Sequence, residues 1–327
     1  PIYMGFLMTE PNSISCTQLA ETYNISHDSV NRFLEREDYT PHDLYQEAIQ
    51  HIDNNKLIVS IDDTVLDKPY SQHMDLVSYF WSGKHHRSVK GINLITLYAT
   101  DQNGQNIPIN FRIYDKSEGK TKNDYFMDML SEVLSWGAKI QFITGDSWYS
   151  STGNLKTIRK YGIRFMFGID CNRKVSPEKG QWFQLRLLPD FHQGQVVWLK
   201  DFGFVQLFKT QLKEQQRFYI VHQDEDDLLS FEGFHELHSS HWKIEQYHRV
   251  IKQVCHIEKF QVRRSKLILN HIFSALMAYV EIQKNQFERI FENVYRWQKK
   301  LFRPIIKDFI DDFILDKNHL LPQRIYK

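Results

Sequence analysis

The sequence has few of the features that would place it in a membrane or in an oxidising compartment. It contains three cysteines in 327 residues, and these lie far apart and without CxxC spacing. Neither a disulfide framework nor a cysteine zinc site is therefore expected. No apolar run approaches the roughly 18 residues that span a bilayer. The segment 1–8 also has neither the charged start nor the small-residue cleavage site of a secretory signal. These absences predict a soluble, cytosolic protein.

The chain also lacks a strong net charge. Its formal charge is +1, so the overall balance says nothing for or against a nucleic-acid partner. The charges are unevenly distributed, however, because residues 241–266 carry seven lysines and arginines against two acids. Such a stretch is compatible with a phosphate-binding face, although a run of charge is more often a solvated surface. Hydrophobic residues make up 42% of the chain, which is ample for one large domain or for two to three smaller ones.

Residues 12–37 have the pattern of a helix-turn-helix. Two short helices are predicted, Cys16–Tyr23 and His27–Arg36, joined by a three-residue turn that ends in a serine able to cap the second helix. The second helix would present Ser29 and Arg32 outward, as a recognition helix presents its side chains to the major groove. Two-helix hairpins without DNA are also common, so both interpretations of this segment stay open.

From residue 56 the periodicity changes to that of an α/β protein. Strands are predicted at 57–61, 91–100, 107–114, 140–144 and 164–169, and helices at 123–136 and 154–161. The order is three strands, helix, strand, helix, strand. This order is that of a ribonuclease-H-like mixed sheet with helices on its faces.

Residues 171–232 have a different sequence pattern, in which short aromatic strands alternate with turn residues. We interpret this segment as an all-β insertion. Helices return after it. The predicted organisation has five regions. They are a helical DNA-binding region with the helix-turn-helix (1–55), the first part of the core (56–170), the β insertion (171–232), a core helix with a third carboxylate (233–265) and a helical C-terminal region (266–327).

Three carboxylates stand where they could hold metal ions. Asp63 follows the first predicted strand and Asp146 the fourth, and such strand ends converge on one edge of an open sheet. Glu245 lies on the core helix and would complete the group. Oxygen ligands of this kind suit Mg²⁺ or Mn²⁺. Two such ions could activate a water and stabilise the leaving oxygen of a phosphodiester. A single aspartate after a strand more often only caps a loop, so the group carries more weight than any member.

A polar stripe surrounds the third carboxylate on its helix. The stripe consists of His238, His241, Glu245, His248 and Lys252. At about 100° per residue these positions fall within about a quarter of the helix circumference. One acid among cations and imidazoles is what a metal ligand flanked by phosphate-binding groups would need. A zinc hydrolase is the alternative, but His235 and His238 are one residue short of the HExxH spacing.

The segment 241–252, His-Trp-Lys-Ile-Glu-Gln-Tyr-His-Arg-Val-Ile-Lys, resembles the Y-R-E-K signature of DDE cut-and-paste transposases from bacterial insertion sequences. That signature is Tyr, two residues, Arg, three residues, Glu, six residues, Lys. Its spacing is matched by His238, His241, Glu245 and Lys252, with histidine in place of both Tyr and Arg.

Two further segments resemble the same family. The segment 57–64 is similar to its first-aspartate strand, in which the catalytic aspartate directly precedes threonine, and Asp63 is therefore chosen over Asp62. The segment 144–149, Thr-Gly-Asp-Ser-Trp-Tyr, resembles the segment of the second aspartate. A β insertion between the second aspartate and the glutamate is also a feature of the family.

The resemblance implies a DNA transposase that cleaves at transposon ends and joins the freed 3′-hydroxyl to target DNA. Asp63, Asp146 and Glu245 would bind two Mg²⁺, for which Mn²⁺ can substitute. The implied DNA-binding residues are Ser29, Arg32, His238, His241, Arg249 and Lys252. The family also implies a homodimer on DNA, with or without a hairpin intermediate, in the nucleoid region of a bacterial cytoplasm.

Two alternatives stay open beside the transposase. One is a nuclease or resolvase of the same fold that cuts without strand transfer, and the other is a domesticated, non-catalytic DNA-binding protein. The glutamate–lysine motif and the β insertion disfavour the first, and three intact carboxylates disfavour the second. In the insertion, Trp182 and Trp198 are candidates for stacking on a flipped base, although such residues are more often core.

Overall fold

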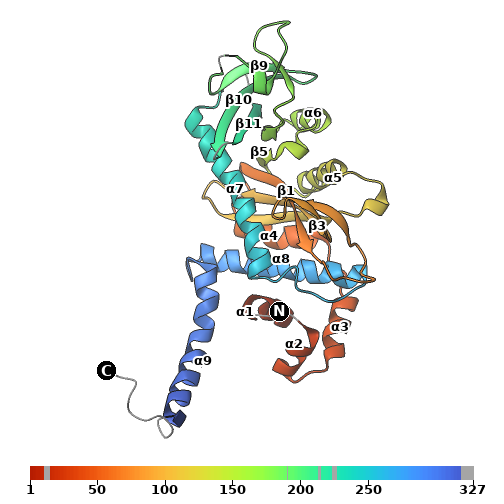
Figure 1. The fold of residues 1–327 in the computed structure, drawn as a ribbon, viewed down its shortest axis with the longest axis vertical. Helices are drawn as coiled ribbons and strands as arrows, with labels where there is room; N and C mark the ends of the chain where they lie inside the picture. The colour runs from red at the N-terminus through yellow and green to blue at the C-terminus, as the bar shows by residue number, and fades with distance from the viewer. Residues whose placement is uncertain (11–14, 190, 213–214, 223–226, 318–327) are drawn as a thin grey trace, which may run out of the picture.

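The computed structural model describes residues 1–10, 15–189, 191–212, 215–222 and 227–317 (Figure 1). The helices are α1 (Ile2–Thr9), α2 (Cys16–Tyr23), α3 (His27–Arg36), α4 (Pro41–Ala48), α5 (Lys122–Ser135), α6 (Thr152–Lys160), α7 (Phe231–Gln253), α8 (Ser265–Phe287) and α9 (Val294–Lys317). The strands are β1 (Leu57–Asp67), β2 (Ser78–Ser82), β3 (Arg87–Thr100), β4 (Asn106–Ile113), β5 (Ile140–Gly145), β6 (Arg164–Ile169), β7 (Lys174–Ser176), β8 (Phe183–Gln184), β9 (Gln195–Leu199), β10 (Gly203–Leu212) and β11 (Gln215–His222). None of these helices, within the described part of the chain, has both the length and the hydrophobicity of a bilayer-spanning segment.

The core sheet has β1 at its centre. Leu57, Val59 and Ile61 of this strand are completely buried, as expected for an apolar strand with neighbours on both sides. The strand order is β4-β3-β1-β5-β6, in which β3 is antiparallel to β1 and β4 is antiparallel to β3. β5 is parallel to β1, and β6 is parallel to β5 after the crossover through α6. The predicted ribonuclease-H-like mixed α/β sheet is therefore confirmed.

The strands that follow β6 extend the same sheet. β11 pairs antiparallel with β6, and β10, β9, β7 and β8 follow outward in that order. The sequence predicted β structure here but not its hydrogen bonding to the core, because an alternating pattern identifies a strand and not its partner. Pairing with β11 covers the edge that β6 would otherwise expose.

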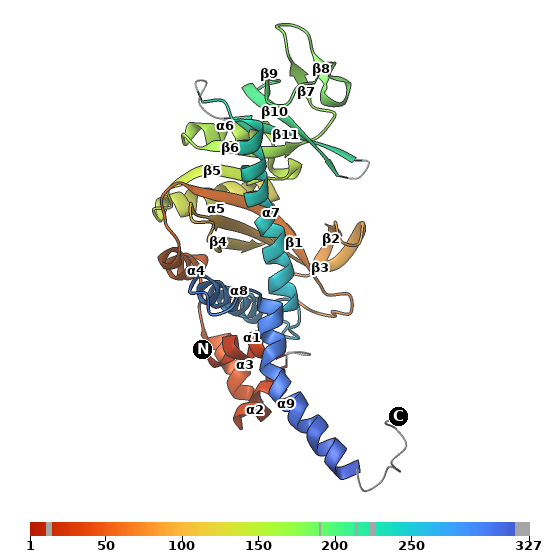
Figure 2. The same ribbon diagram turned by 90° about the vertical axis from the view of Figure 1, so that its left-hand side faces the viewer.

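Helices cover both faces of the sheet (Figure 2). α5 and α6 lie on one face, and α7 crosses the other face and contacts β1. Under the first half of α7, aromatic and aliphatic side chains of β5, β6, β10 and β11 form a separate apolar cluster. In this cluster the rings of Phe208 and Phe234 stack with their centroids 4.4 Å apart. The cluster holds α7 against the sheet and so determines where the polar residues of its second half lie.

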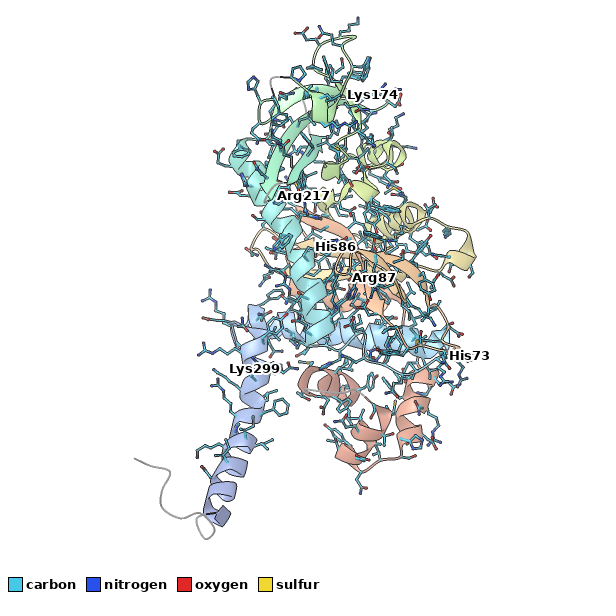
Figure 3. The ribbon with its side chains drawn as sticks, in the orientation of Figure 1. His73, His86, Arg87, Lys174, Arg217 and Lys299 are labelled. Carbon is cyan, nitrogen blue, oxygen red and sulfur yellow. The ribbon has the colours of Figure 1, made fainter. Side chains whose placement is uncertain are left out.

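The N-terminal helices pack on α8, and α9 leaves the body of the molecule (Figure 3). Leu7 of α1 and Leu34 of α3 are fully buried in this packing. α2 and α3 have the predicted bounds, and the Ser26 hydroxyl caps α3 by accepting a hydrogen bond from the backbone N–H of Asp28. Side chains of α9, Lys299 among them, extend into the space around that helix.

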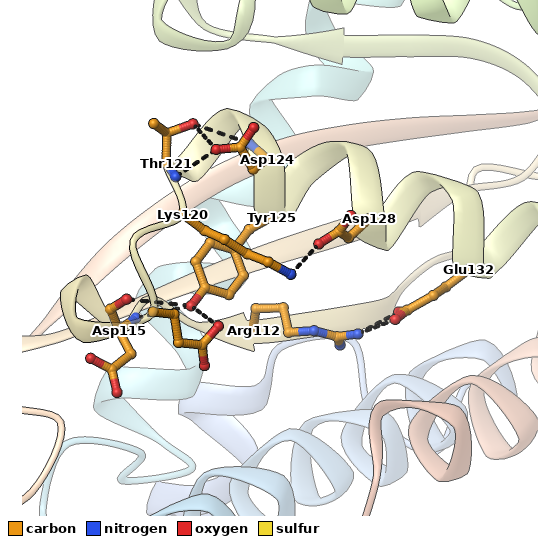
Figure 4. Close-up of polar contacts among 9 residues, drawn as sticks. Arg112, Asp115, Lys120, Thr121, Asp124, Tyr125, Asp128 and Glu132 are labelled. Carbon is orange, nitrogen blue, oxygen red and sulfur yellow. Dashed lines mark hydrogen bonds and ion pairs between the residues drawn. The ribbon is translucent and has the colours of Figure 1, made fainter.

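α5 is joined to β4 and capped by charged groups (Figure 4). The Arg112 guanidinium of β4 forms an ion pair with the Glu132 carboxylate near the end of α5. At its start, Thr121 and Asp124 form a reciprocal capping box, which satisfies two backbone N–H groups. These contacts fix the first residue of α5, Lys122, beside β1.

Candidate functional site

The two adjacent aspartates of β1 lie inside the strand, whereas the sequence had suggested that they stand at its exit. Parallel pairing between β1 and β5 ends at Ile61 and Gly145. β3 continues on the other side, opposite Asp62 and Asp63 and on to Asp67, so β1 remains a strand. Both aspartates therefore lie beside the point where β5 stops.

Asp63 faces α5 and accepts hydrogen bonds from three side chains. Its Oδ1 accepts from the Tyr149 hydroxyl at 2.9 Å, and its Oδ2 accepts from Asn93 Nδ2 at 2.6 Å and from Lys122 Nζ at 2.7 Å. With a cation and two neutral donors around it, this carboxylate is electrostatically and geometrically satisfied within the protein.

Asp62 faces the opposite way, toward α7. Three potential metal-ligand atoms meet there, namely a carboxylate oxygen from Asp62, another from Glu245 and a ring nitrogen of His248. These atoms all lie within 4.8 Å of one another. Burial raises the pKa of the Asp62 carboxyl well above its ordinary value, and the negative charges of Asp146, Asp63 and Glu245 raise this pKa further. Adjacent residues of a strand alternate between its faces, which is why only one of the two aspartates can join α7.

Asp146 lies at the end of β5, directly after Gly145. Its carboxylate accepts a hydrogen bond from the backbone N–H of Trp148 at 2.9 Å and so caps the 3-10 turn that follows. Although part of Asp146 is exposed, surrounding protein desolvates the carboxyl, and together with the charge of Asp63 this raises its pKa to about 6. Gly145 lets the backbone of β5 pack close to the side chains of Phe167 and Ile61. A Cβ at this position would lie 2.6 Å from the Phe167 ring and 2.7 Å from Ile61.

These residues fit a divalent cation. Burial and the nearby charge of Lys252 lower the pKa of His248 to about 3, so its imidazole is neutral, the form that binds metals. Its Nδ1 lies 3.6 Å from Asp62 Oδ2, and its Nε2 is buried with no hydrogen-bond partner among the described residues. The mutual repulsion of Asp62, Asp146 and Glu245 also calls for a positive charge between them.

The other predicted members of the α7 stripe are engaged within the protein. Lys252 Nζ donates to the backbone oxygen of Val65 at 2.6 Å and lies 3.9 Å from Glu258. His241 Nδ1 lies 3.1 Å from the Thr144 hydroxyl, and burial lowers the pKa of this imidazole to about 4. The contacts with Val65 and Thr144 tie α7 to the core sheet.

His238, closer to the start of α7, is engaged in the same way. Its Nε2 lies 3.0 Å from the Tyr219 hydroxyl of β11, and burial lowers its pKa. The two rings meet edge to face, with centroids 5.0 Å apart. His238 and His241 therefore both contact the sheet as neutral side chains.

The remaining predicted site residues lie outside this group. Ser29 and Arg32 line a shallow depression on α3, and Arg249 is on an exposed part of α7 near α9. Trp182 and Trp198 are 44% and 42% exposed, so both belong to the surface of the β insertion and not to the core. The ring of Trp198 meets that of Phe204 edge to face at 4.8 Å.

From the sequence, His248 was expected in the polar stripe but not as a ligand, Asp62 was passed over in favour of Asp63, and the partners of Asp63 were not predicted. A signal for two of them was available. Alternation along a strand requires Asp62 and Asp63 to face opposite ways, and His248 lies one helical turn after Glu245. The face that α7 covers could not be known beforehand.

Known proteins resemble the chain to different degrees. A family model described as "Transposase DDE domain" matches residues 53–280. No curated protein sequence matches significantly. Similar solved structures include Marinitoga piezophila Argonaute in complex with 5′-hydroxyl guide RNA and target DNA, at 10% identity and a TM-score of 0.23. The match covers 65% of this chain but only 28% of that Argonaute. The NurA nuclease of Sulfolobus solfataricus is another, at 10% identity and a TM-score of 0.24, covering 84% of this chain and 94% of the nuclease. TM-scores this low carry no weight for function.

Proposed function

The chain belongs to the transposase DDE-domain family, and on this basis we propose that it is an active DNA transposase of a bacterial insertion sequence. It would cleave DNA at transposon ends and join the freed 3′-hydroxyls to target DNA. The family is catalytic and uses divalent metals. The observation that carries the proposal is the acidic group of Asp62, Glu245 and His248, with Asp146 beside it, at the point where β5 stops next to β1.

In this proposal Asp62, Asp146 and Glu245 hold two Mg²⁺ ions, and His248 is an additional nitrogen ligand. Bound ions would activate the attacking hydroxyl and stabilise the leaving oxygen of the phosphodiester. The resemblance alone favoured Asp63 as the first carboxylate. We assign that role to Asp62, because Asp62 faces Glu245 while the oxygens of Asp63 already accept from three donors.

Asp63 then has a positioning role. Its bonds to Tyr149 and Lys122 connect β1 to the turn after Asp146 and to the start of α5. The negative charge of Asp63 also contributes to the raised pKa of Asp146, so it affects how readily that carboxyl gives up its proton. It acts on the reacting groups through these neighbours.

The signature on α7 is used differently from the pattern that the resemblance implied. Lys252 and Glu245 keep its spacing, whereas His238 and His241 are neutral and bonded to Tyr219 and Thr144. We propose that these two histidines fix α7 on the sheet, and that DNA phosphates are bound by permanently charged groups such as Arg249. Ser29 and Arg32, exposed on α3, would read the sequence of the transposon ends.

The direct test uses purified protein and DNA containing the ends that flank its gene, with Mg²⁺ or Mn²⁺. Strand cleavage followed by joining to a second DNA is expected. Asp62→Asn, Asp146→Asn and Glu245→Gln should each lose cleavage but still bind the ends. Cleavage without joining would indicate a nuclease or resolvase, and end binding without any cleavage would indicate a domesticated protein. We propose a homodimer as the DNA-bound form, with one subunit for each end.

A further inference from the structure

Trp148 is a large exposed side chain only two residues after Asp146. It is 63% exposed, whereas the next residue, Tyr149, is completely buried. Both belong to the 3-10 turn between β5 and α6 (Figure 1). Two residues of chain span at most about 7 Å, so the backbone of Trp148 lies beside the acidic group.

The backbone that carries Trp148 is held from several sides. Its N–H donates to Asp146 Oδ1 at 2.9 Å, and the Tyr149 hydroxyl donates to a carboxylate of β1, also at 2.9 Å. The turn also packs closely on β6, because a Cβ on Gly168 would lie 3.1 Å from the backbone nitrogen of Ser147. The exposed indole is therefore mounted on a preorganised turn and keeps its place relative to Asp146.

Lys122 contacts the indole from one side. Its Nζ lies over the Trp148 ring, 5.6 Å from the centroid, which is within the range of a cation–π contact. The same ammonium is 2.7 Å from Asp63. Most of the indole is nevertheless uncovered by the described residues, so it offers a flat apolar surface to a binding partner.

The place of Trp148 favours DNA as that partner. A protein bound here would block the approach of a phosphodiester to Asp62, Asp146 and Glu245. Aromatic side chains stack on bases of any sequence, because every base has a π-face. Inside an intact duplex both faces of a base pair are covered by its neighbours, and unstacking a base costs free energy. Cleavage removes one neighbour and leaves the terminal base pair with an open face.

We propose that Trp148 stacks on the terminal base of the cleaved transposon end and so keeps its 3′-hydroxyl beside the acidic group until the hydroxyl is joined to target DNA. The inference rests on the proposed function, because it requires a cleaved end at Asp146. Successive nucleotides of one strand are about 3.4 Å apart along the helix axis, so a turn this close to Asp146 reaches the nucleotide that carries the hydroxyl. Trp148 thereby distinguishes the cleaved end from the uncleaved DNA.

The first experiment compares two duplexes by fluorescence anisotropy. Both contain the same end sequence, but one stops at the cleavage site with a 3′-hydroxyl and the other continues into flanking DNA. Ca²⁺, which also takes oxygen ligands, replaces Mg²⁺, and denaturing gels verify that the DNA stays intact. Trp148→Ala should bind the cleaved duplex about tenfold more weakly and the uncleaved duplex less than about twofold more weakly, because only the first loses a stacking contact.

Two further variants serve as controls. Trp148→Tyr should stay within about threefold of wild type on the cleaved duplex, because it keeps an aromatic face. Trp81→Ala removes a tryptophan that is 65% exposed on β2 and should leave the ratio of the two affinities unchanged. Thermal midpoints of the Trp148 variants should match wild type, since the side chain is exposed. Equal losses on both duplexes, or no loss on either, would overturn the inference alone. A wild type that binds neither duplex would overturn the proposed function together with it.

The second experiment observes the stack directly. The cleaved duplex carries 2-aminopurine, whose fluorescence is quenched by stacking, as the terminal base. Saturating wild type should lower this fluorescence, and Trp148→Ala should not. An increase with wild type would mean that the base leaves the helix, and equal quenching by both proteins would mean that another group covers it. Either result would overturn the role of Trp148.

Discussion

Asp62 and Asp63 are neighbours in one strand, yet their carboxylates have opposite environments. Asp63 is surrounded by the donors of Tyr149, Asn93 and Lys122, whereas Asp62 faces Glu245 and the neutral imidazole of His248. One carboxylate is satisfied by the protein, and the other belongs to a group whose charges repel one another. On this difference rests our proposal that Asp62 is a metal ligand and Asp63 a positioning group.

The first prediction compares Asp62→Asn with Asp63→Asn. Asp62→Asn should weaken Mn²⁺ binding by more than about a hundredfold, the upper end of the effect of losing an outer-shell partner of a metal ligand. Asp63→Asn should retain most of that affinity and lose stability, of the order of 2 kcal/mol, because Lys122 is left without its anion. Calorimetric titration with Mn²⁺ and urea unfolding measure the two effects. The reverse result would return the ligand role to Asp63.

A second prediction concerns Gly145, the last residue of β5, which directly precedes Asp146. Gly145→Ala should destabilise the protein by about 1–3 kcal/mol, because its Cβ would overlap the Phe167 ring and the Ile61 side chain. The displaced Asp146 should also bind metal more weakly. Gly153→Ala is the control, since its Cβ would come no nearer than 4.0 Å to the Ser151 hydroxyl oxygen. Equal unfolding free energies for the two variants would show that the contact at Gly145 relaxes without cost.

The third prediction is a pH dependence of the metal-free protein. The pKa of Asp146 is raised from 3.8 to about 6, so between these values the folded state binds more protons than the unfolded state. Its contribution to the free energy of unfolding therefore falls as pH rises from about 4 to about 6 and stays reduced above. Asp146→Asn should be more stable than wild type above pH 6 and lose this advantage toward pH 4. Thermal midpoints across that range measure the difference, which would be constant if the carboxyl were unperturbed.

A fourth prediction follows from the contact between His241 and Thr144. Because burial lowers the pKa of His241 to about 4, its imidazole should stay neutral from pH 8 down to about 5 in an NMR titration. His241→Arg would place a permanent charge in that confined position and should cost of the order of 3 kcal/mol. An imidazole that titrates near its ordinary pKa of about 6.5 would instead support a phosphate-binding role.

The fifth prediction distinguishes a role of α3 in recognising the DNA sequence from a role in the stability of the fold. Ser29→Ala and Arg32→Ala change exposed side chains, so stability should change by no more than about 0.5 kcal/mol. Discrimination between transposon ends and unrelated DNA should fall by about 1–3 kcal/mol for each side chain that no longer reaches a base edge. Fluorescence anisotropy with both DNAs measures this, and Lys160→Ala on α6 is the exposed control. Unchanged discrimination would remove α3 from recognition.

Much of the fold could be predicted from local patterns. The bounds of α2 and α3, the helical periodicity of α5 and the alternation of strands and helices from β1 to β6 all depend on residues close in sequence. α1 was not predicted, because it is apolar on all sides and has no amphipathic pattern. The extension of β1 to Asp67 was also missed, because it is stabilised by β3, a neighbour about thirty residues away in the pairing of Asp63 with Ile95.

That Glu245 and Asp146 lie near β1 could be expected from the motif spacing and from the predicted strand end, and both do lie near Asp62. Their part in catalysis stays a prediction. The roles of His238 and His241 could not be anticipated, since their partners Tyr219 and Thr144 lie in strands whose place beside α7 is a property of the tertiary fold.

The wide separation of the site residues along the chain has a consequence for synthesis. At about 5–20 residues per second, a ribosome needs roughly 10 to 40 s to proceed from Asp62 to Glu245. Leu7 and Leu34, buried early in the chain, also wait for α8 before they are covered. A nascent or prematurely terminated chain that ends before α7 therefore has neither the third carboxylate nor a docked N-terminal region. In the proposed transposase, DNA cleavage would therefore have to wait until the ribosome has passed α7, so that unfinished chains would leave DNA uncut.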